Sequence, residues 1–445
     1  MKITVVGIGY VGLVTSVCLA NIGHKVICYD ISKEKIELLK KLKSPIYEYG
    51  IDELLIKNKN RLFFTTNSEE AFKNSNIIII AVGTPENSDG STNLKYLEDT
   101  IKEFSKYISN DCVLVIKSTV PIGTNDIIEE KLNDNSKYNI FVVSNPEFLS
   151  QGSAVRDTLY ASRIIIGANN KKAENIIKKM YLPLSREPYN VPIVTMDRKS
   201  AELVKYSSNC FLAMKISYIN EIANLCEKVD ANILNVVEGM KYDSRIGAKF
   251  LDAGIGFGGS CFPKDIKSLY KFSIDNNCEL KLIKSTIDVN QKQKMILLDK
   301  LEKNEGCLKN KTIAILGLTF KANTDDIRES PANYIVPKLL KKKCFINVYD
   351  PVGLNNFKKY IKNNFQQNNI KYFTDIDSAI INADYVLIIN DWDIIKNYKL
   401  SKYVSLMKKP IIYDGRNLYN IKEVKKYNIK YYPIGINVER DDFDV

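Results

Sequence analysis

The first thirty residues contain the feature that most constrains how this chain can fold. Residues 2–6, KITVV, are a short apolar run typical of a buried strand, and the glycine-rich stretch GIGYVG follows at 7–12. The next residues, LVTSVCLANIG, have helical spacing and end in a glycine stop. A strand, a G-x-G-x-x-G turn and a helix in this order predict a βαβ unit that binds a dinucleotide.

Each glycine of this turn has a predicted task. Gly7 permits the tight turn, Gly9 lets the backbone approach a pyrophosphate, and Gly12 lets the helix pack closely on the strand. The next predicted strand, HKVICYD, ends in Asp30, whose carboxylate would accept hydrogen bonds from ribose hydroxyls and repel a 2′-phosphate. The sequence therefore predicts NAD as the cofactor, in preference to NADP. The candidate cofactor-binding residues of the turn are Gly7, Ile8, Gly9, Tyr10, Val11 and Gly12.

The rest of the chain alternates between two kinds of pattern. Buried strands are expected within NIIIIAVGTP, CVLVIKSTVP, IFVVSNPEF and SRIIIGA, with helical segments between most of them, which predicts a parallel doubly wound sheet. From about residue 200 the spacing is helical, and strands return at KNKTIAILGLTFKA, CFINVYDP, ADYVLIIND and PIIYDGRN. We therefore expect an α/β fold with two doubly wound Rossmann-like domains joined by a central helical segment, divided at 1–198, 199–303 and 304–445.

Composition excludes several classes of function. The formal charge is +12, but the basic excess is mostly lysine spread along 445 residues, which favours a solvated surface over nucleic-acid binding. Nine cysteines without a C-x-x-C pair and a single histidine indicate neither a disulfide framework nor a metal site. With no apolar run long enough to span a bilayer and no signal-peptide pattern, we expect a cytoplasmic protein without membrane partners.

One cysteine lies where a structural cysteine would be unusual. In GIGFGGSCFPKD, residues 254–265, Cys261 follows two adjacent glycines and precedes Lys264 and Asp265, so its surroundings favour exposed backbone. Such a thiol can add to a carbonyl to give a hemithioacetal, and loss of hydride then leaves a thioester that water cleaves. We expect Cys261 to be a nucleophile and the other cysteines to be structural.

Two threonines follow predicted strands at the carboxyl edge of the first sheet. Thr84 lies in AVGTPENSDGS and Thr119 in KSTVPIGT, so each can reach a cofactor or an active-site water. Taken singly, each is equally typical of an ordinary strand-to-helix turn with a threonine cap. Their common edge is what makes Thr84, Pro85 and Thr119 candidate cofactor-binding residues.

Five further motifs carry a family resemblance. Behind GIGYVG the chain contains STVPIGT, SNPEFLSQG, KYSSNCFLAMKISYINE, RIGAKFLDAGIGFGGSCFPKD and GLTFKANTDDIRES, in this order. Over nearly its whole length the sequence resembles the UDP-glucose 6-dehydrogenase family. The resemblance implies two NAD-linked oxidations of UDP-glucose to UDP-glucuronate through a cysteine thioester, in a homodimer or larger homo-oligomer. It also implies an NAD-binding domain at 1–198, a dimerisation region with the cysteine loop at 199–303, and a UDP-sugar-binding domain at 304–445.

The same resemblance implies roles for single residues. Cys261 matches the nucleophile and Asp265 the carboxylate that holds or activates water, while Lys205 and Asn209, four residues apart on one helical face, match the groups that stabilise an oxyanion. Thr119 and Glu147 match positions that bind water and assist proton transfer. Substrate-binding positions are Glu147, Phe148, Leu149, Lys205, Asn209, Arg245, Phe250, Leu251, Asp252, Ala253, Gly254, Gly258, Lys321 and Arg416, and further cofactor positions are Lys35, Gln151 and Arg328.

One position departs from the family pattern, and several functions stay open. The family commonly reads EFLREG where this chain has EFLSQG, so Gln151 replaces a glutamate near the cofactor and loses its charge. Related enzymes oxidise UDP-N-acetylhexosamines or GDP-mannose by the same chemistry, although GFGGSCFPKD and NPEFL favour the glucose branch. A nucleotide-sugar-binding protein without catalysis would show damage to the reactive set, yet Cys261, Lys205, Asn209 and Asp265 are all present.

Overall fold

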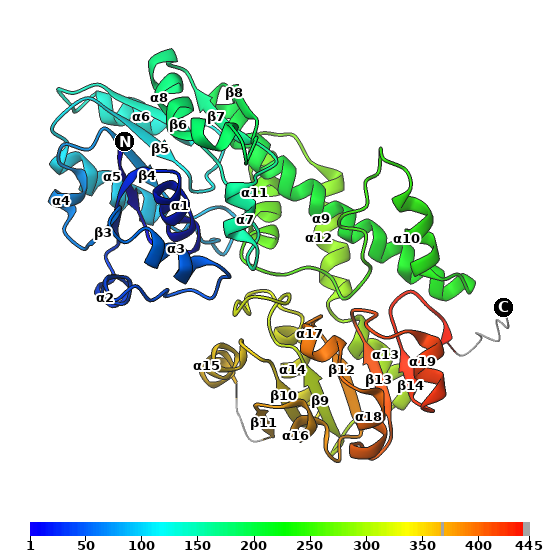
Figure 1. Cartoon of the computed structure of the whole chain (residues 1–445). Coiled ribbons are helices and arrows are strands. Elements are labelled where there is room, and N and C mark those ends of the chain that lie inside the picture. Colours follow the sequence, from blue (N-terminus) through cyan, green and yellow to red (C-terminus); the bar gives the residue numbers. More distant parts are fainter. Residues whose placement is uncertain (366–368, 439–445) are drawn as a thin grey trace. The chain divides into compact units, whose positions relative to one another are not determined.

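The computed structural model describes residues 1–365 and 369–438. The chain forms two compact units, each with its own sheet (Figure 1). Unit 1 comprises Met1–Ser208 with Lys271–Asn276, and unit 2 comprises Asn209–Tyr270 with the chain from Asn277 onward. The boundary falls inside one long helix, α9 (Arg198–Val229), so residues on successive turns of this helix belong to different units. The expected division at 198 and 303 stays a prediction.

Unit 1 is built on an eight-stranded sheet in the order β3-β2-β1-β4-β5-β6-β7-β8. Its inner strands are nearly continuous apolar runs, as burial on both faces requires; β4, for example, is IIII and wholly buried. The strands are β1 (Lys2–Val6), β2 (Lys25–Tyr29), β3 (Leu62–Thr65), β4 (Ile77–Ile80), β5 (Cys112–Ile116), β6 (Ile140–Ser144), β7 (Ile164–Ala168) and β8 (Ile193–Met196).

Helices cover both faces of this sheet, and two separate apolar clusters fill the space beneath them (Figure 1). Asparagine and serine side chains begin several of the helices by accepting a backbone N–H bond, as Asn170 does at the start of α8. The helices are α1 (Tyr10–Asn21), α2 (Lys33–Lys40), α3 (Ile51–Lys57), α4 (Ser68–Phe72), α5 (Lys95–Tyr107), α6 (Thr124–Asn133), α7 (Ala154–Leu159) and α8 (Lys171–Tyr181), with a 3₁₀ turn at Leu182–Ser185.

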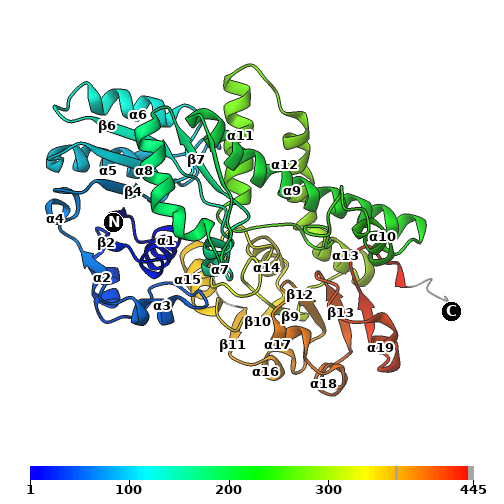
Figure 2. The same cartoon turned by 45° about the horizontal axis from the view of Figure 1, so that its top comes forward.

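Unit 2 contains a six-stranded, fully parallel sheet in the order β11-β10-β9-β12-β13-β14 (Figure 2). Its strands are β9 (Thr312–Leu316), β10 (Phe345–Tyr349), β11 (Ile370–Phe373), β12 (Tyr385–Ile388), β13 (Ile411–Asp414) and β14 (Lys430–Tyr432). The helices around it are α14 (Ala332–Lys341), α15 (Leu354–Asn364), α16 (Ile376–Ile380), α17 (Asp393–Lys396), α18 (Leu400–Leu406) and α19 (Ile421–Lys426).

Between β8 and β9 the chain, all of it described, forms only helices and loops, which confirms the expected helical segment. These helices are α9, α10 (Ile233–Lys241), α11 (Phe262–Asp275), α12 (Lys281–Gln293) and α13 (Ile296–Glu305). Across the described ranges, no helix combines the length and the apolar character that crossing a bilayer requires.

The sequence pattern predicted both doubly wound sheets but not every strand direction. β7 pairs with β6 in antiparallel fashion, and β8 follows β7 in parallel, so the last two strands of unit 1 run against the other six. An apolar run is the same in both directions, and only the connection decides its orientation. A long apolar run is also easier to recognise than β3, β8, β11 or β14, which have three or four residues each and exposed positions.

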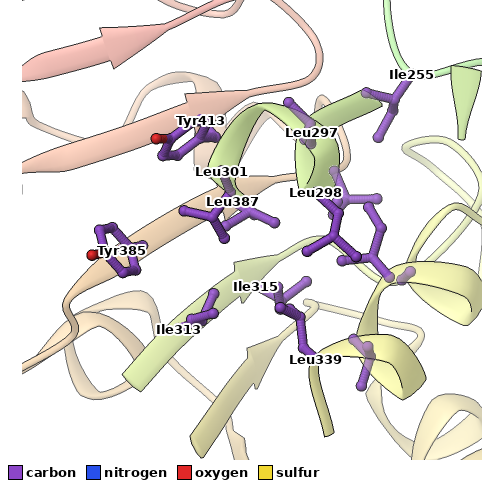
Figure 3. Packing of buried hydrophobic residues seen from close by; sticks show 14 of the residues in the cluster. Ile255, Leu297, Leu298, Leu301, Ile313, Ile315, Leu339, Tyr385, Leu387 and Tyr413 are labelled. Atoms are coloured by element: carbon purple, nitrogen blue, oxygen red, sulfur yellow. The ribbon is translucent and has the colours of Figure 1, made fainter. Parts of the chain in front are cut away.

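The core of unit 2 offers a direct test of this packing. Ile315 on β9 is fully buried among Leu298, Leu339 and Leu387 (Figure 3), whereas Ile381, at the end of α16, is 51% exposed. Ile315→Ala should lower the free energy of unfolding by about 2–5 kcal/mol, because it removes buried methyl groups and leaves a cavity. The matched Ile381→Ala should change it by no more than about 0.5 kcal/mol. Urea unfolding followed by circular dichroism measures both, and equal losses would contradict the assigned core.

Candidate active site

The glycine turn of unit 1 is shaped for close approach of a dinucleotide. Gly7 has φ +85°, and a Cβ atom at Gly12 would lie only 1.9 Å from the Gly7 carbonyl oxygen, so both positions require glycine. A Cβ atom at Gly9 would meet no described atom within 4 Å, which leaves this backbone open on its outer side. The N-terminus of α1 follows directly at Tyr10, where backbone N–H groups favour a phosphate.

Asp30 lies where the ribose acceptor was predicted. It follows β2 directly, is 7% exposed, and accepts hydrogen bonds from the backbone N–H groups of Ile8 and Ser32, each at 2.8 Å. Lys35 Nζ lies 3.4 Å from Asp30 Oδ2, so the predicted phosphate-contacting lysine is beside the predicted ribose acceptor. The turn, the carboxylate and the lysine together fit NAD.

The other predicted cofactor residues of unit 1 meet at the carboxyl edge of the sheet. Thr84 Oγ1 donates to the Thr119 carbonyl at 2.8 Å, which brings the loops after β4 and β5 together. The N–H of Gly152, next to Gln151, donates to the Tyr10 hydroxyl at 3.0 Å and to Glu48 Oε2 at 2.6 Å. Tyr10 therefore joins the glycine turn to the loop after β6, and Glu48, which sequence reasoning missed, accepts hydrogen bonds from the same loop.

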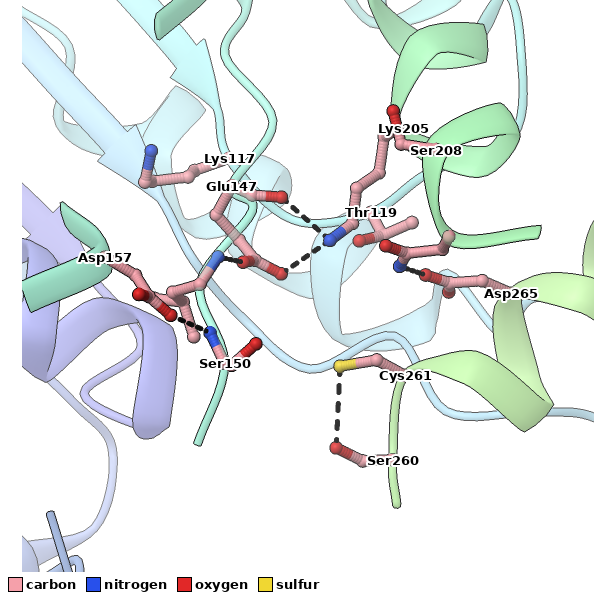
Figure 4. A network of polar contacts seen from close by, with 12 residues as sticks. Lys117, Thr119, Glu147, Ser150, Asp157, Lys205, Ser208, Ser260, Cys261 and Asp265 are labelled. Carbon is pink, nitrogen blue, oxygen red and sulfur yellow. Dashed lines mark hydrogen bonds and ion pairs between the residues drawn. The ribbon is translucent and has the colours of Figure 1, made fainter. Parts of the chain in front are cut away.

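A buried ion pair forms the polar centre of this edge (Figure 4). Lys205 Nζ, on α9, lies 2.9 Å from Glu147 Oε1 and donates to the Glu147 carbonyl oxygen at 2.7 Å; the two side chains are 4% and 6% exposed. The second carboxylate oxygen accepts from the Leu149 N–H at 2.8 Å. The guanidinium carbon of Arg163 lies over the Phe148 ring, 3.7 Å from the centre of that ring. The Glu147 carboxylate is thus held by the Lys205 ammonium and the Leu149 N–H, which suits a group that transfers protons at a fixed place.

Sequence reasoning missed a second buried lysine beside this pair. Lys117 is 8% exposed, and its Nζ donates to Asn145 Oδ1 at 3.1 Å, an oxygen that also accepts from the Tyr181 hydroxyl at 2.6 Å. Burial lowers the pKa of Lys117 from 10.5 to about 8, although Glu147 acts in the opposite direction. A cavity of about 60 Å³ adjoins it and includes Glu147 and Thr15 in its wall. The signal in the sequence was the lysine that ends an otherwise apolar strand, KSTV.

The cysteine loop belongs to unit 2. Cys261 is exposed at the N-terminus of α11, an end that favours an anion such as a thiolate, and Ser260 Oγ lies 3.7 Å from its Sγ (Figure 4). Asp265, one turn further along and 1% exposed, accepts from Asn209 Nδ2 at 2.7 Å and from Lys264 Nζ at 2.6 Å. Asn209 and Asp265, which the sequence predicted separately as catalytic residues, are therefore in hydrogen-bond contact.

Accessibility separates Cys261 from most other cysteines. Six of the nine are buried, namely Cys18, Cys28, Cys112, Cys210, Cys226 and Cys344, and burial raises the pKa of Cys18, Cys28, Cys112 and Cys210 to about 12. A thiol in that state is a poor nucleophile near neutral pH. Cys278 and Cys307 are exposed, but neither lies in a glycine loop before a helix.

Three amides hold the loop before Cys261, and sequence reasoning found none of them. Asn220 accepts from the Gly254 N–H at 2.8 Å, and Gln293 Nε2 donates to the Gly254 carbonyl at 2.7 Å. Asn290 accepts from the Phe257 N–H at 2.8 Å and donates to its carbonyl at 3.0 Å. These residues come from α9 and from α12, so no short motif in the sequence marks them.

The loop glycines touch the predicted UDP-sugar residues within unit 2. A Cβ atom at Gly254 would lie 3.1 Å from a terminal nitrogen of Arg416, and one at Gly258 only 2.4 Å from the Glu329 carbonyl oxygen. Arg416 Nε donates to the Ile389 carbonyl at 3.0 Å, and Lys321 lies over the Phe320 ring. Of the segment Phe250, Leu251, Asp252 and Ala253, Phe250 has φ +65° and Asp252 is exposed.

Two further predicted arginines, Arg245 and Arg328, are each paired with an aspartate. Arg245 is paired with Asp243 and its side chain is 88% exposed, while Arg328 is paired with Asp326 at 2.6 Å. Lys205 and Asn209 lie one turn apart on α9, the first bound to Glu147 and the second to Asp265. In the described ranges no three histidine, cysteine or acidic side chains are grouped to hold a metal ion.

The buried Lys117 predicts a pH-dependent stability. Between about pH 8 and 10.5 the unfolded chain holds a proton that folded Lys117 has lost, so this lysine makes the free energy of unfolding rise with pH in that window. Lys117→Met removes this pH dependence. The free energy of unfolding of the variant minus that of the wild type should therefore fall by up to roughly 3 kcal/mol between pH 7 and 10.5. Urea unfolding across this range measures it. The exposed Lys102→Met is the control, and parallel curves for Lys117→Met and the wild type would refute the assignment.

Comparisons with known proteins agree with this geometry. The UDP-glucose/GDP-mannose dehydrogenase family matches in three consecutive parts: its NAD binding domain at residues 1–185, its central domain at 199–292 and its UDP binding domain at 314–421. The chain is 44% identical over 439 residues to a UDP-glucose 6-dehydrogenase of Bacillus subtilis (98% of each chain), and 42% identical over 442 residues to that of Rickettsia bellii (98% and 100%).

Solved structures give the same result. A UDP-glucose dehydrogenase from Pyrobaculum islandicum superposes with a TM-score of 0.88 at 32% identity, covering 97% of this chain and 96% of that one. A UDP-D-ManNAc dehydrogenase from Pyrococcus horikoshii gives 0.85 at 28% identity, covering 98% and 100%. With a glycine turn and Asp30 that fit NAD, and family matches along both units, the chain belongs to the UDP-glucose/GDP-mannose dehydrogenase family, whose cofactor is NAD.

Proposed function

We propose that this protein oxidises UDP-glucose to UDP-glucuronate with NAD, through a thioester on Cys261. The observation that carries the proposal is an exposed thiol at the N-terminus of α11, one helical turn before the buried Asp265 that Asn209 holds. The relatives named UDP-glucose 6-dehydrogenase, 42–44% identical over almost the full length, support the sugar. When bound, NAD supplies the acceptor for the hydride that leaves the sugar carbon in each oxidation.

In the first oxidation the chain's own groups manage a proton. As hydride leaves C6 of the glucose unit, the hydroxyl proton passes to a base, and Glu147 is placed for this by its bonds to Lys205 and the Leu149 N–H. The Lys205 ammonium stabilises negative charge on the sugar oxygen, as does the amide of Asn209. Thr119 orients water at the edge of the sheet, where Thr84 bonds its carbonyl.

In the second oxidation Cys261 carries the substrate. Its thiolate forms an S–C bond with the aldehyde carbon, and the oxygen of the resulting hemithioacetal takes up a proton. Loss of that proton and of a second hydride gives the thioester. Water then attacks the carbonyl carbon, Asp265 accepts a proton from it, and the C–S bond breaks to return the thiolate and release the carboxylate. Asp265 is held for this task by Asn209 and Lys264.

In this proposal unit 2 supplies the groups that bind the pyrophosphate of the nucleotide sugar. Arg416 and Lys321 supply cations for the pyrophosphate, and the backbone of Gly254 and Gly258 allows close approach. Arg328 and Gln151 are proposed as cofactor contacts, Gln151 without the charge of a glutamate. We also propose that the protein works in the cytoplasm as a homodimer or larger homo-oligomer in which the exposed Arg245 reaches a second copy.

The stoichiometry of the reaction tests the proposal directly. Purified protein should form about two NADH per UDP-glucose consumed, because alcohol and aldehyde each lose one hydride. Absorbance at the NADH band and chromatography of the sugar nucleotide measure the ratio. A ratio of one, or none, would refute the four-electron route.

Replacing the nucleophile gives the second test. Cys261→Ser should lower turnover by about 10³-fold or more, since removal of a nucleophile leaves only binding and orientation. Cys278→Ser, which changes another exposed thiol, is the matched control and should leave turnover unchanged. Intact mass spectrometry would detect an acyl adduct on the serine variant, and wild-type turnover in that variant would exclude Cys261 as the nucleophile.

Sugar choice is a separate question, and a substrate panel answers it. Dehydrogenases of acetamido sugars share this fold, as the Pyrococcus horikoshii structure illustrates, so the fold alone does not discriminate. We expect kcat/KM for UDP-glucose to exceed that for UDP-N-acetylglucosamine, UDP-N-acetylmannosamine and GDP-mannose by at least about 10²-fold, since an added acetamido group, or the guanine base and C2 configuration of GDP-mannose, changes the groups that the site must fit. A higher kcat/KM for one of these would reassign the substrate within the family.

A further inference from the structure

The turn that follows β9 in unit 2 is docked directly against the cysteine loop. The Gly259 N–H donates to the Arg328 carbonyl at 2.8 Å, and a Cβ atom at Gly258 would lie 2.4 Å from the Glu329 carbonyl oxygen. The Phe320 ring covers Gly259, where an added Cβ atom would lie 2.9 Å from the ring. Cys261 lies two residues after Gly259, so the Arg328–Glu329 turn contacts the backbone immediately before the thiol.

This turn is strained and therefore needs an anchor. Glu329 has φ +56°, a left-handed conformation that costs a residue with a side chain free energy and persists only where surrounding contacts impose it. Its carboxylate lies 2.6 Å from Lys294 Nζ and accepts from the Tyr334 hydroxyl at 2.6 Å. Lys294 Nζ also lies 4.4 Å from the centre of the Tyr334 ring.

Lys294 is an unusual lysine because it is completely buried, at the C-terminal end of α12. The neighbouring Asn290 and Gln293 bind the backbone of Phe257 and Gly254, so one turn of α12 contacts the loop by two routes, directly and through Glu329. Burial alone would raise the pKa of the Glu329 carboxyl, and the Lys294 ammonium brings it below its ordinary value. Burial in turn lowers the pKa of Lys294, and the positive charge of Lys267 on α11 contributes to lowering the pKa of the Glu329 carboxyl.

We propose that Lys294 is a positioning residue for the nucleophile: through Glu329 it fixes the Arg328–Glu329 turn, and this turn holds the Gly258–Gly259 backbone and sets the place of Cys261. The same contact keeps Arg328 close enough for its guanidinium to favour the Cys261 thiolate. Consistent with this, the pKa of Arg328 is raised, mainly by its hydrogen bond to Asp326 and also by the negative charges of Asp326 and Cys261. The inference deepens the proposed function and rests on it for the role of Cys261.

The reactivity of the thiol itself tests this proposal without any sugar or NAD. Iodoacetamide labelling, resolved by peptide mass spectrometry, gives separate rates for the three exposed cysteines, Cys261, Cys278 and Cys307. Lys294→Met should slow labelling of Cys261 at pH 7 by about tenfold, because displaced Arg328 no longer favours the thiolate, a change equal to about one unit in the midpoint of the pH–rate curve. Cys278 and Cys307 serve as internal controls and should keep their rates within about twofold.

Two further variants separate positioning from simple stability. Lys294→Met leaves the Glu329 carboxylate, 31% exposed, without its ammonium partner, whereas Lys294→Met/Glu329→Gln removes both charges and should recover the wild-type Tm. If the pair positions the loop, the double variant recovers Tm but not the Cys261 labelling rate, and kcat for UDP-glucose stays about 10- to 100-fold low with KM little changed. Lys300→Met is the matched control, since Lys300 pairs with Glu227 at 2.5 Å in the same unit.

Each outcome has a defined reading. An unchanged or faster Cys261 labelling rate in Lys294→Met, recovery of both Tm and labelling in the double variant, or an equal effect in Lys300→Met would overturn the proposal. Slowed labelling confined to the Lys294 and Glu329 variants supports it. If the wild type makes no NADH from UDP-glucose, the proposed function fails, while the labelling rates still decide whether Lys294 sets the reactivity of Cys261.

Discussion

Burial of both faces of two parallel sheets is the constraint on which the rest of this structure depends. A parallel strand needs a crossover, and the crossover helices cover the faces, so the strands consist of almost uninterrupted apolar residues. Polar and strained residues are therefore displaced to the loops at the strand ends. In unit 1 the glycine turn, Thr84 and Glu147 all follow carboxyl ends of strands, and in unit 2 Arg328 and Arg416 do the same.

The reactive groups are lysines, carboxylates and a thiol, and each is controlled by its burial and its partners. Lys205 and Glu147 are buried together, which is tolerable because every ionised atom has a hydrogen-bond partner close by. Asp265 is buried against an amide and an ammonium. The single histidine has a structural place instead: His24 Nε2 lies 2.8 Å from the Met180 carbonyl, and burial lowers its pKa. Cys261 differs from these groups, since it is exposed at a helix N-terminus, an end that favours a thiolate.

Much of the fold and part of the site could be predicted from local patterns. The glycine turn with Asp30 eighteen residues beyond Gly12 predicted the cofactor, and the odd setting of Cys261 predicted a nucleophile. The direction of β7 and β8 could not be predicted, because apolar alternation is identical in both directions. Residues that act only by touching a distant segment were also missed: Glu48, Asn220, Asn290 and Gln293 leave no mark in the sequence near them.

The sequence alone determined the architecture and the type of chemistry, because strand apolarity, glycine spacing and the placing of one thiol are properties of short stretches. The tertiary structure decided which polar groups are buried together and in which charge state they lie. Lys294 illustrates the difference: in the sequence it is one of many lysines, and in the fold it is fully buried against Glu329, thirty-five residues away, beside the loop that presents Cys261. Burial and electrostatic interaction arise only when distant segments pack together, and these two quantities set the energies of charged groups.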